Sequence, residues 1–232
     1  MGKIMTKNNR NHLRLLAALA LFCALAYAVT LIFHIKVSFL TFDAKDAVVC
    51  IAAMIFGVLP STVIALVVST IEAISISDTA FWGWLMNFIS TAVFAAVAGI
   101  IYRRVRKMWG AILGLGLAVV IFTGVMMAMN LIITPIYMKT SVEVVKGLIP
   151  TLLLPFNLIK ALLNAALVLA FYKPIVTALR KAKVLPAREL AVETAGYRMN
   201  AKSVAVLCVA AAVAVGCVLA MVYLMNGSLS FA

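Results

Sequence analysis

The sequence predicts an all-α membrane protein, a bundle of helices that crosses the bilayer several times. Of its 232 residues, 66% are hydrophobic and the mean hydropathy is +1.17, more than a soluble domain of this size can bury. The hydrophobic residues form continuous runs of helical length, which excludes a barrel of short alternating strands. The charged residues lie between the runs, so the net charge of +13 indicates contact with anionic lipid headgroups and not with nucleic acid.

The first hydrophobic run covers residues 13–35 and follows a basic segment. The tripeptide at Ala26 to Ala28 resembles a signal-peptidase site, but the run continues well beyond it, so we expect a retained helix. Ala20, Ala24 and Ala28 recur every four residues and form a small-residue stripe that lets another helix approach closely. Internal packing and docking to a partner explain this stripe equally well.

Four helices are expected in the middle of the chain, after a mixed polar loop at residues 36–46. The first two are short for a span, which tilted or re-entrant helices can be. Proline and clusters of basic residues are typical of helix ends and loops. The expected helices are residues 47–57, 61–73, 81–102 and 111–134, with breaks at Pro60, at 103–107 and at Pro135.

The sixth run, residues 150–171, carries the most informative polar side chains. Asn157, Lys160 and Asn164 are spaced at i, i+3 and i+7, so they share one face of the helix. A lysine in hydrocarbon costs roughly 2.5–3.5 kcal/mol, so this face either lines a wet cavity or contacts polar groups of neighbouring helices. The structural alternatives for Lys160 are a salt bridge to Glu72 or Asp78, or snorkelling of its side chain to the outer surface.

A basic segment and a seventh hydrophobic run follow. We therefore divide the chain into a membrane domain (1–183), a basic cytoplasmic linker (184–202) and an additional transmembrane helix with its tail (203–232). If the N-terminus lies inside, 15 lysines and arginines fall on the inner side and four on the outer side. This bias predicts a multi-pass protein of the plasma membrane with a cytoplasmic N-terminus and an external C-terminus.

Amides, one cation and aromatic rings gather in the outer half of the predicted bundle. Amides both donate and accept hydrogen bonds, and aromatic faces stack on flat rings. We therefore expect a pocket, open to the outside, for an uncharged or mildly anionic small molecule. An interfacial aromatic belt and hydrogen bonds between helices are the alternatives. The candidate ligand contacts are Asn87, Asn130, Asn157, Lys160, Asn164, Phe42, Trp82 and Tyr137.

The sequence gives no support for catalysis or for a resident cofactor or metal. It contains no GxxxxGK[ST], HExxH or GxSxG motif, and its four cysteines form no CxxC pair. The acids Asp43, Asp46 and Glu72 are expected near the outer ends of the helices, away from any mid-membrane ion relay. A binding protein that takes its energy from partners fits these observations better than a self-sufficient pump.

Four segments carry a family resemblance: LTFDAKDAVVCIAAMIFG, WLMNFISTAVFAAVAGIIYRR, MNLIITPIYM and LLLPFNLIKALLNAALVLAFYKPIVTALR. They resemble the substrate-binding S component of energy-coupling-factor (ECF) vitamin transporters, and most of all its riboflavin-specific type. The resemblance covers about residues 13–183. The sequence PFNLIK, followed by an asparagine and by YKP, is its most distinctive part.

This resemblance implies a six-helix S-component core that captures riboflavin, or a related flavin, from outside. It also implies docking on a transmembrane T subunit that two cytoplasmic ATPases drive. By position, Asn87, Asn130, Asn157 and Lys160 would contact the ligand with Asn164 below them, residues 37–46 would form a lid, and the alanine stripe would dock on the T subunit. The seventh run departs from the six-helix pattern.

Three other functions remain open from the sequence. The chain could be an S component for a different vitamin, or a non-transporting membrane module for assembly or sensing. An intramembrane enzyme would need a nucleophile and a base facing each other, and the sequence offers no such pair. Retention of a small molecule by the purified protein separates the first class from the others.

Overall fold

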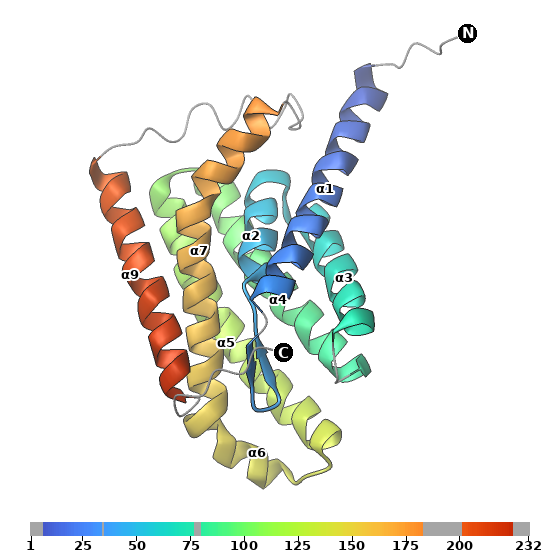
Figure 1. The fold of residues 1–232 in the computed structure, drawn as a ribbon, viewed down its shortest axis with the longest axis vertical. Helices are drawn as coiled ribbons and strands as arrows, with labels where there is room; N and C mark the ends of the chain where they lie inside the picture. The colour runs from blue at the N-terminus through green and yellow to red at the C-terminus, as the bar shows by residue number, and fades with distance from the viewer. Residues whose placement is uncertain (1–6, 34, 77–79, 183–200, 225–232) are drawn as a thin grey trace.

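The computed structural model describes residues 7–33, 35–76, 80–182 and 201–224, which form a bundle of helices with one short β-hairpin toward one end (Figure 1). The elements are α1 (Lys7–Ile32), β1 (Ile35–Val37), β2 (Leu40–Phe42), α2 (Lys45–Phe56), α3 (Val58–Ser75), α4 (Ala80–Val105), α5 (Met108–Met138), α6 (Val142–Leu148), a π-helical turn (Ile149–Leu153), α7 (Leu154–Lys181) and α9 (Ala201–Leu224). The expected multi-pass helical bundle is confirmed, with the hairpin as an addition.

Five helical segments among the described residues are long and apolar enough to cross a membrane. They are α1, α3, α4, α5 and the continuous stretch from α6 through α7. α2 has 12 residues, about 18 Å of helix, and is too short to span a hydrocarbon core of about 30 Å. Every residue of α2 is buried, so this short helix forms the centre of the bundle.

α1 packs on the bundle through one ridge of small and aromatic side chains. Ala18, Phe22, Ala26 and Thr30 are spaced four residues apart and are at most 1% exposed. The Phe22 ring meets the Phe56 ring edge to face, with centroids 5.7 Å apart. This ridge holds α1 against α2 and α3 and leaves the opposite side of α1 uncovered.

The break between α2 and α3 lies at Gly57, and the prediction of a break at Pro60 was wrong. Gly57 has φ 103°, a conformation that glycine adopts without a steric penalty. Pro60 lies in the first turn of α3, where its missing N–H would have no helical partner. Arg103 Nη1 donates to the carbonyl oxygen of Ile55 at 2.8 Å and so satisfies the end of α2.

The predicted end of the fifth helix at Pro135 was also wrong, because α5 continues to Met138. A proline removes one backbone hydrogen bond, and helices in apolar surroundings tolerate this loss. α5 ends instead at Lys139, which has φ 51° in the left-handed region. The extra turn places Tyr137 at the end of the helix, where it lines the cavity described below.

The sixth run is longer than predicted. The π-helical turn Ile149–Leu153 joins α6 to α7, and α7 continues through Pro174 to Lys181. The expected inward face of this helix is confirmed. Asn157, Lys160 and Asn164 are 2%, 4% and 0% exposed.

Residues 36–46 were predicted to form a mixed loop, but their first part folds as an antiparallel hairpin. Ile35 pairs with Phe42 and Val37 with Leu40, so Ser38 and Phe39 form a two-residue turn. Ser38 has φ 57°, as tight hairpin turns require. The hairpin lies between the helices at the end of the bundle that also carries α6 (Figure 1).

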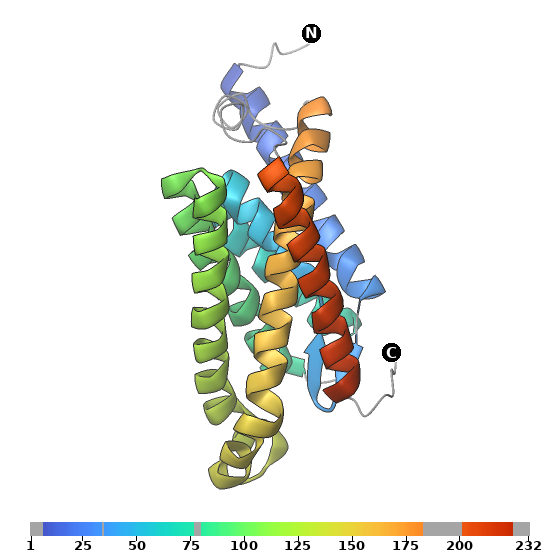
Figure 2. The same ribbon diagram turned by 90° about the vertical axis from the view of Figure 1, so that its left-hand side faces the viewer.

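α9 packs along α7 at the outside of the bundle (Figure 2). Cys217 of α9 belongs to a small buried cluster with Val37, Phe42, Phe156 and Leu163. The seventh hydrophobic run is therefore a helix in contact with the bundle. Most of the predicted linker lies outside the described residues, because only its last two positions fall in α9.

The two ends of the bundle differ in charge. The last turn of α4 carries Arg103 and Arg104, and the turn to α5 carries Arg106 and Lys107. The start of α1 and the end of α7, with Lys181, lie at this same end of the molecule, which we call the basic end (Figure 1). The hairpin and α6 lie at the opposite end.

Candidate functional site

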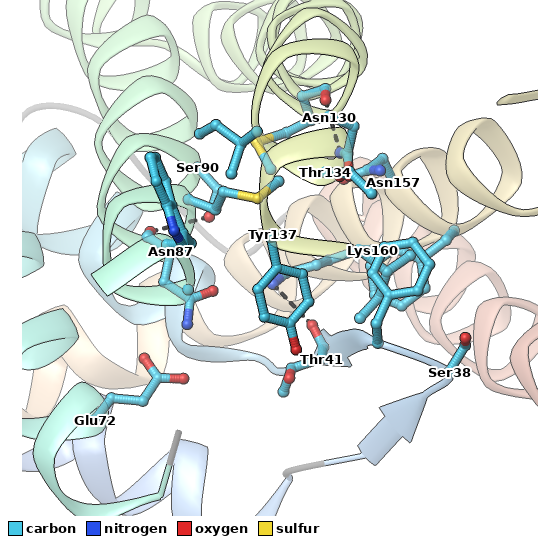
Figure 3. A pocket seen from close by; sticks show the side chains of 18 of the residues that line it. Ser38, Thr41, Glu72, Asn87, Ser90, Asn130, Thr134, Tyr137, Asn157 and Lys160 are labelled. Carbon is cyan, nitrogen blue, oxygen red and sulfur yellow. Dashed lines mark hydrogen bonds between the residues drawn. The ribbon is translucent and has the colours of Figure 1, made fainter. Parts of the chain in front are cut away.

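A cavity of about 200 Å³ lies beside the hairpin, at the end of the bundle opposite the basic end. Its walls come from the hairpin, the end of α3, the start of α4, the last turns of α5 and the start of α7. Figure 3 shows side chains from all of these elements converging on one space. The labelled polar residues are Ser38, Thr41, Glu72, Asn87, Ser90, Asn130, Thr134, Tyr137, Asn157 and Lys160.

The structure brings six of the eight predicted ligand contacts to this cavity. Asn87, Asn130, Asn157, Lys160, Trp82 and Tyr137 line it. Asn164 and Phe42 do not belong to its lining. The residues that meet here come from distant parts of the chain. The sequence pattern predicted their common depth in the bundle but not their contacts.

Two of the cavity's amides are held by hydrogen bonds to residues four positions away in the chain. Asn130 Nδ2 donates to the carbonyl oxygen of Met126 at 2.8 Å, and its Oδ1 accepts from Thr134 Oγ1 at 2.9 Å. Asn157 Nδ2 donates to the carbonyl oxygen of Leu153 at 2.8 Å. These bonds fix the orientation of both amides, and the Asn157 Oδ1 atom keeps its capacity to accept from a ligand.

Lys160 ties the hairpin to α7. Its Nζ donates to the carbonyl oxygen of Thr41 at 3.2 Å and to Asp43 Oδ2 at 2.9 Å. The predicted alternative of a salt bridge to Glu72 was wrong, because Asp43 is the partner, and Asp78 lies outside the described residues. An ammonium group has three donors, so one can still reach into the cavity.

A cluster of charged residues lies inside the bundle where the hairpin joins α2. Asp43, Lys45, Asp46, Glu72 and Lys160 are each at most 4% exposed. Asp46 and Glu72 lie near helix ends, as predicted, but all three acids are buried inside the bundle. Lys45, one of the four cations counted on the outer side, is buried with them. The cause is the path of the chain, since β2 leads directly into the short, buried α2.

Opposite charges pair within this cluster. Lys45 Nζ bonds to Glu72 Oε2 and lies 3.7 Å from Asp43 Oδ2. Asp46 Oδ1 accepts from Thr91 Oγ1 at 2.5 Å. With three carboxylates and two ammonium groups, the cluster has a formal excess of one negative charge. We call these five residues the charged cluster.

Asn164 and Phe42 instead support the walls of the cavity. Asn164 Oδ1 accepts from the backbone N–H of Ala47 at 2.8 Å, in the first turn of α2, and its Nδ2 donates to the carbonyl oxygen of Asp43 at 3.2 Å. It thereby satisfies one of the free N–H groups at the helix start. The Phe42 ring packs against the Phe156 ring, with centroids 6.2 Å apart.

Sequence reasoning missed several lining residues. Glu72 and Ser90 line the cavity from α3 and α4. Ser38 and Thr41 line it from the hairpin; they fall within the predicted lid but were not predicted as individual contacts. An acid within a long apolar segment is a recognised signal of a functional site, so Glu72 could have been singled out. The serines and Thr41 carry no such signal.

The three alanines of the predicted docking stripe lie on the uncovered side of α1. Ala20, Ala24 and Ala28 are exposed, whereas the ridge that is offset from them by two residues is buried. The stripe is therefore free of internal packing within the described part of the chain. A flat surface of small side chains on a membrane helix suits close approach by another helix.

Comparison with known proteins identifies the family. Residues 14–172 match the family model described as "ECF transporter, substrate-specific component". The chain is 26% identical over 185 residues to the riboflavin transporter RibU of Staphylococcus aureus (strain TCH60), and the match covers 75% of this chain and 97% of that protein.

A solved structure also shares the fold. The structure described as "Structure and mechanism of the S component of a bacterial ECF transporter" superimposes with a TM-score of 0.61 at 24% identity, over 75% of this chain and 99% of that one. The part of the chain beyond the family match includes α9. The chain belongs to the substrate-specific components of ECF transporters.

Proposed function

We propose that this chain captures riboflavin from outside the cell and passes it inward with the help of partner subunits. The observation that carries the proposal is the amide-lined cavity under the hairpin. The similarity to RibU, which extends over 97% of that protein's length, supports riboflavin as the ligand.

The chemistry of the cavity suits a flavin. The flavin ring is flat and presents carbonyl oxygens and one imide N–H, and its ribityl chain carries hydroxyl groups. Trp82 and Tyr137 offer aromatic faces, and Asn87 and Asn157 offer amide groups at the same level. A ligand with both a ring and hydroxyl groups can use every one of these contacts.

The hairpin acts as the lid of the site in this proposal. Four of its residues, 38–41, line the cavity, and Lys160 holds the Thr41 backbone from the other side. Opening the cavity to a ligand requires the hairpin to move away from α7. The ion pair between Lys160 and Asp43 then re-forms as the lid closes.

The orientation follows from charge. The basic end would face the cytoplasm, which places the N-terminus inside and the cavity at the outer surface. This arrangement allows the site to collect its ligand from the medium. It also agrees with the position of the hairpin, which is at the end opposite the α4–α5 turn (Figure 1).

The sequence contains no GxxxxGK[ST] nucleotide-binding motif, and in this proposal partner subunits supply the energy for transport. In this proposal the exposed stripe of Ala20, Ala24 and Ala28 docks on the T subunit, and two cytoplasmic ATPases supply the energy. Substitution of Ala24 by tryptophan would hold a partner helix away. The matched control is Ala212→Trp on the exposed face of α9.

The docking proposal is tested by uptake of riboflavin in cells that contain the partner subunits. We expect Ala24→Trp to abolish ATP-dependent uptake while riboflavin binding by the purified subunit is retained. Ala212→Trp should leave both unchanged. Normal uptake by the Ala24 variant would refute docking through α1.

The ligand site is tested by titration of purified variants with riboflavin. Asn157→Ala and Asn87→Ala each remove one hydrogen-bonding group, worth about 0.5–1.5 kcal/mol, so Kd should rise roughly 2- to 10-fold. Asn11→Ala, on α1 and outside the cavity lining, is the control and should bind as the wild type does. Unchanged Kd values in both cavity variants would refute this placement of the ligand.

A further inference from the structure

One buried carboxylate oxygen faces the cavity without a partner. Glu72 lies near the end of α3, is 1% exposed and lines the cavity. Its Oε2 accepts from Lys45, but its Oε1 has no hydrogen-bond partner among the described residues. The other two unpartnered buried side-chain oxygens in the described ranges are Asp43 Oδ1 and Ser69 Oγ, and neither residue belongs to the lining.

The pairing of Glu72 Oε2 with Lys45 holds the other oxygen in place. Glu72 is the carboxylate partner of the Lys45 ammonium group, and a carboxylate can only accept hydrogen bonds. Figure 3 shows the Glu72 carboxylate on the same side of the cavity as the Asn87 amide and the hairpin residue Thr41. A buried acceptor that lacks a donor is costly, whereas a donor placed opposite it forms a charge-assisted bond.

We propose that Glu72 Oε1 is a specificity-determining acceptor, which selects a ligand that places a hydroxyl or ring N–H group at this wall of the cavity. The inference rests on the proposed function, because it concerns the same site. It adds a residue that the sequence analysis did not assign and a requirement on the ligand. The formal negative excess of the charged cluster disfavours an anionic group at the same position.

The requirement divides the donors of riboflavin into two testable sets. The imide N–H is absent from N3-methylriboflavin, and the ribityl hydroxyls are absent from lumiflavin. If Glu72 accepts a hydrogen bond from one of these donors, the analogue without that donor makes no bond to Glu72. The Kd of that analogue should then change little when Glu72 is substituted. Substitution Glu72→Gln keeps the shape of the side chain, and its carbonyl oxygen can still accept from Lys45.

The experiment measures the Kd of riboflavin, N3-methylriboflavin and lumiflavin for the full-length wild type and for Glu72→Gln, by quenching of flavin fluorescence. A hydrogen bond to a charged acceptor corresponds to a loss of about 10- to 150-fold for riboflavin. We expect this loss to fall to about 2-fold or less with one of the two analogues. That selective pattern identifies a direct contact, because a purely structural role would weaken all three ligands alike.

Ser69→Ala is the matched control, since Ser69 is a buried, unpartnered polar residue one turn away on the same helix and outside the lining. It should leave all three Kd values unchanged. An unchanged Kd for riboflavin in Glu72→Gln, an equal loss for all three ligands, or the same selective pattern in Ser69→Ala would each overturn the inference alone. A wild type that fails to bind riboflavin would overturn the proposed function, and this inference with it.

Discussion

Replacing Lys160 by methionine tests how the lid is held. The change keeps the length of the side chain and removes its ammonium group, which donates to Asp43 Oδ2 at 2.9 Å and to the Thr41 carbonyl at 3.2 Å. Both charged side chains of this pair are at most 5% exposed. Removal of the ammonium group leaves the Asp43 carboxylate inside the bundle without this partner.

The loss of the Lys160–Asp43 ion pair sets how much Lys160→Met lowers the free energy of unfolding. Breaking a buried ion pair by removing one partner costs about 3–5 kcal/mol. Lys45 Nζ remains 3.7 Å from Asp43 Oδ2 and compensates part of the stranded charge, so the low end of this range applies. Because Asp43 Oδ1 already lacks a partner, little other compensation is present among the described residues. We expect a loss of about 3 kcal/mol in the free energy of unfolding.

The assay is a double-mutant cycle on ligand-free protein in detergent, with loss of structure followed by circular dichroism as SDS is added. The other two variants are Asp43→Asn alone and the combination of Lys160→Met with Asp43→Asn, which removes the stranded charge. We expect the double variant to be more stable than Lys160→Met alone, since the carboxylate that needs a partner is gone. A double variant whose losses simply add, or a Lys160→Met protein as stable as the wild type, would refute the ion-pair account of the lid.

Three further predictions use the same assay or the same ligand. Gly99→Ala should lower the free energy of unfolding by about 1–3 kcal/mol, because a Cβ there would lie 2.9 Å from a neighbouring Cβ of α2. Gly116→Ala, where a Cβ meets nothing within 4 Å, should be neutral or stabilising. Equal effects of the two substitutions would contradict this packing. Thr91→Val should lower the free energy of unfolding by about 1–3 kcal/mol, because it leaves a buried Asp46 oxygen without its donor. Thr62→Val on α3 loses only a bond to its own helix and should lower it less. A chain truncated to residues 1–183 should bind riboflavin with a Kd close to that of the full chain, because α9 contributes no residue to the cavity lining; loss of binding would refute the proposed domain boundary.

The hydrophobic pattern is sufficient to predict the multi-pass helical bundle and the inward face of α7. A lysine and two asparagines on one face of a membrane helix are costly unless that face meets polar groups or water. The spacing of Asn157, Lys160 and Asn164 by itself therefore indicates a polar interior. The same reasoning predicts that Asn87 and Asn130 face the interior, and both line the cavity. These predictions succeed because each rests on the cost of an unsatisfied polar group in hydrocarbon.

The charged cluster could not be predicted in the same way. In the sequence, Asp43, Lys45 and Asp46 stand in a polar loop and look like exposed residues. Their burial depends on the hairpin that precedes them, and three-residue strands are too short for their alternation to be recognised. The separate roles of Lys160, which holds the lid, and Asn164, which caps α2, depend on contacts between residues 117 positions apart in the chain.

The helix breaks show a second limit. Proline is a common sign of a helix end, yet Pro60 lies in an opening turn and Pro135 lies inside α5. In an apolar environment the alternative to a kinked helix is exposed backbone, which costs more than one missing hydrogen bond. Glycine with positive φ, at Gly57, marks the real break.

The most direct test of the account is a riboflavin titration of ligand-free, detergent-purified protein, followed by quenching of flavin fluorescence. The cavity under the hairpin is one site per chain in this account, so we expect saturable quenching at a stoichiometry near one to one. Protein purified without removal of its ligand should show flavin absorption bands. Fluorescence that stays unquenched at every protein concentration would contradict riboflavin as the ligand and leave the substrate of this ECF component to be found among other small molecules.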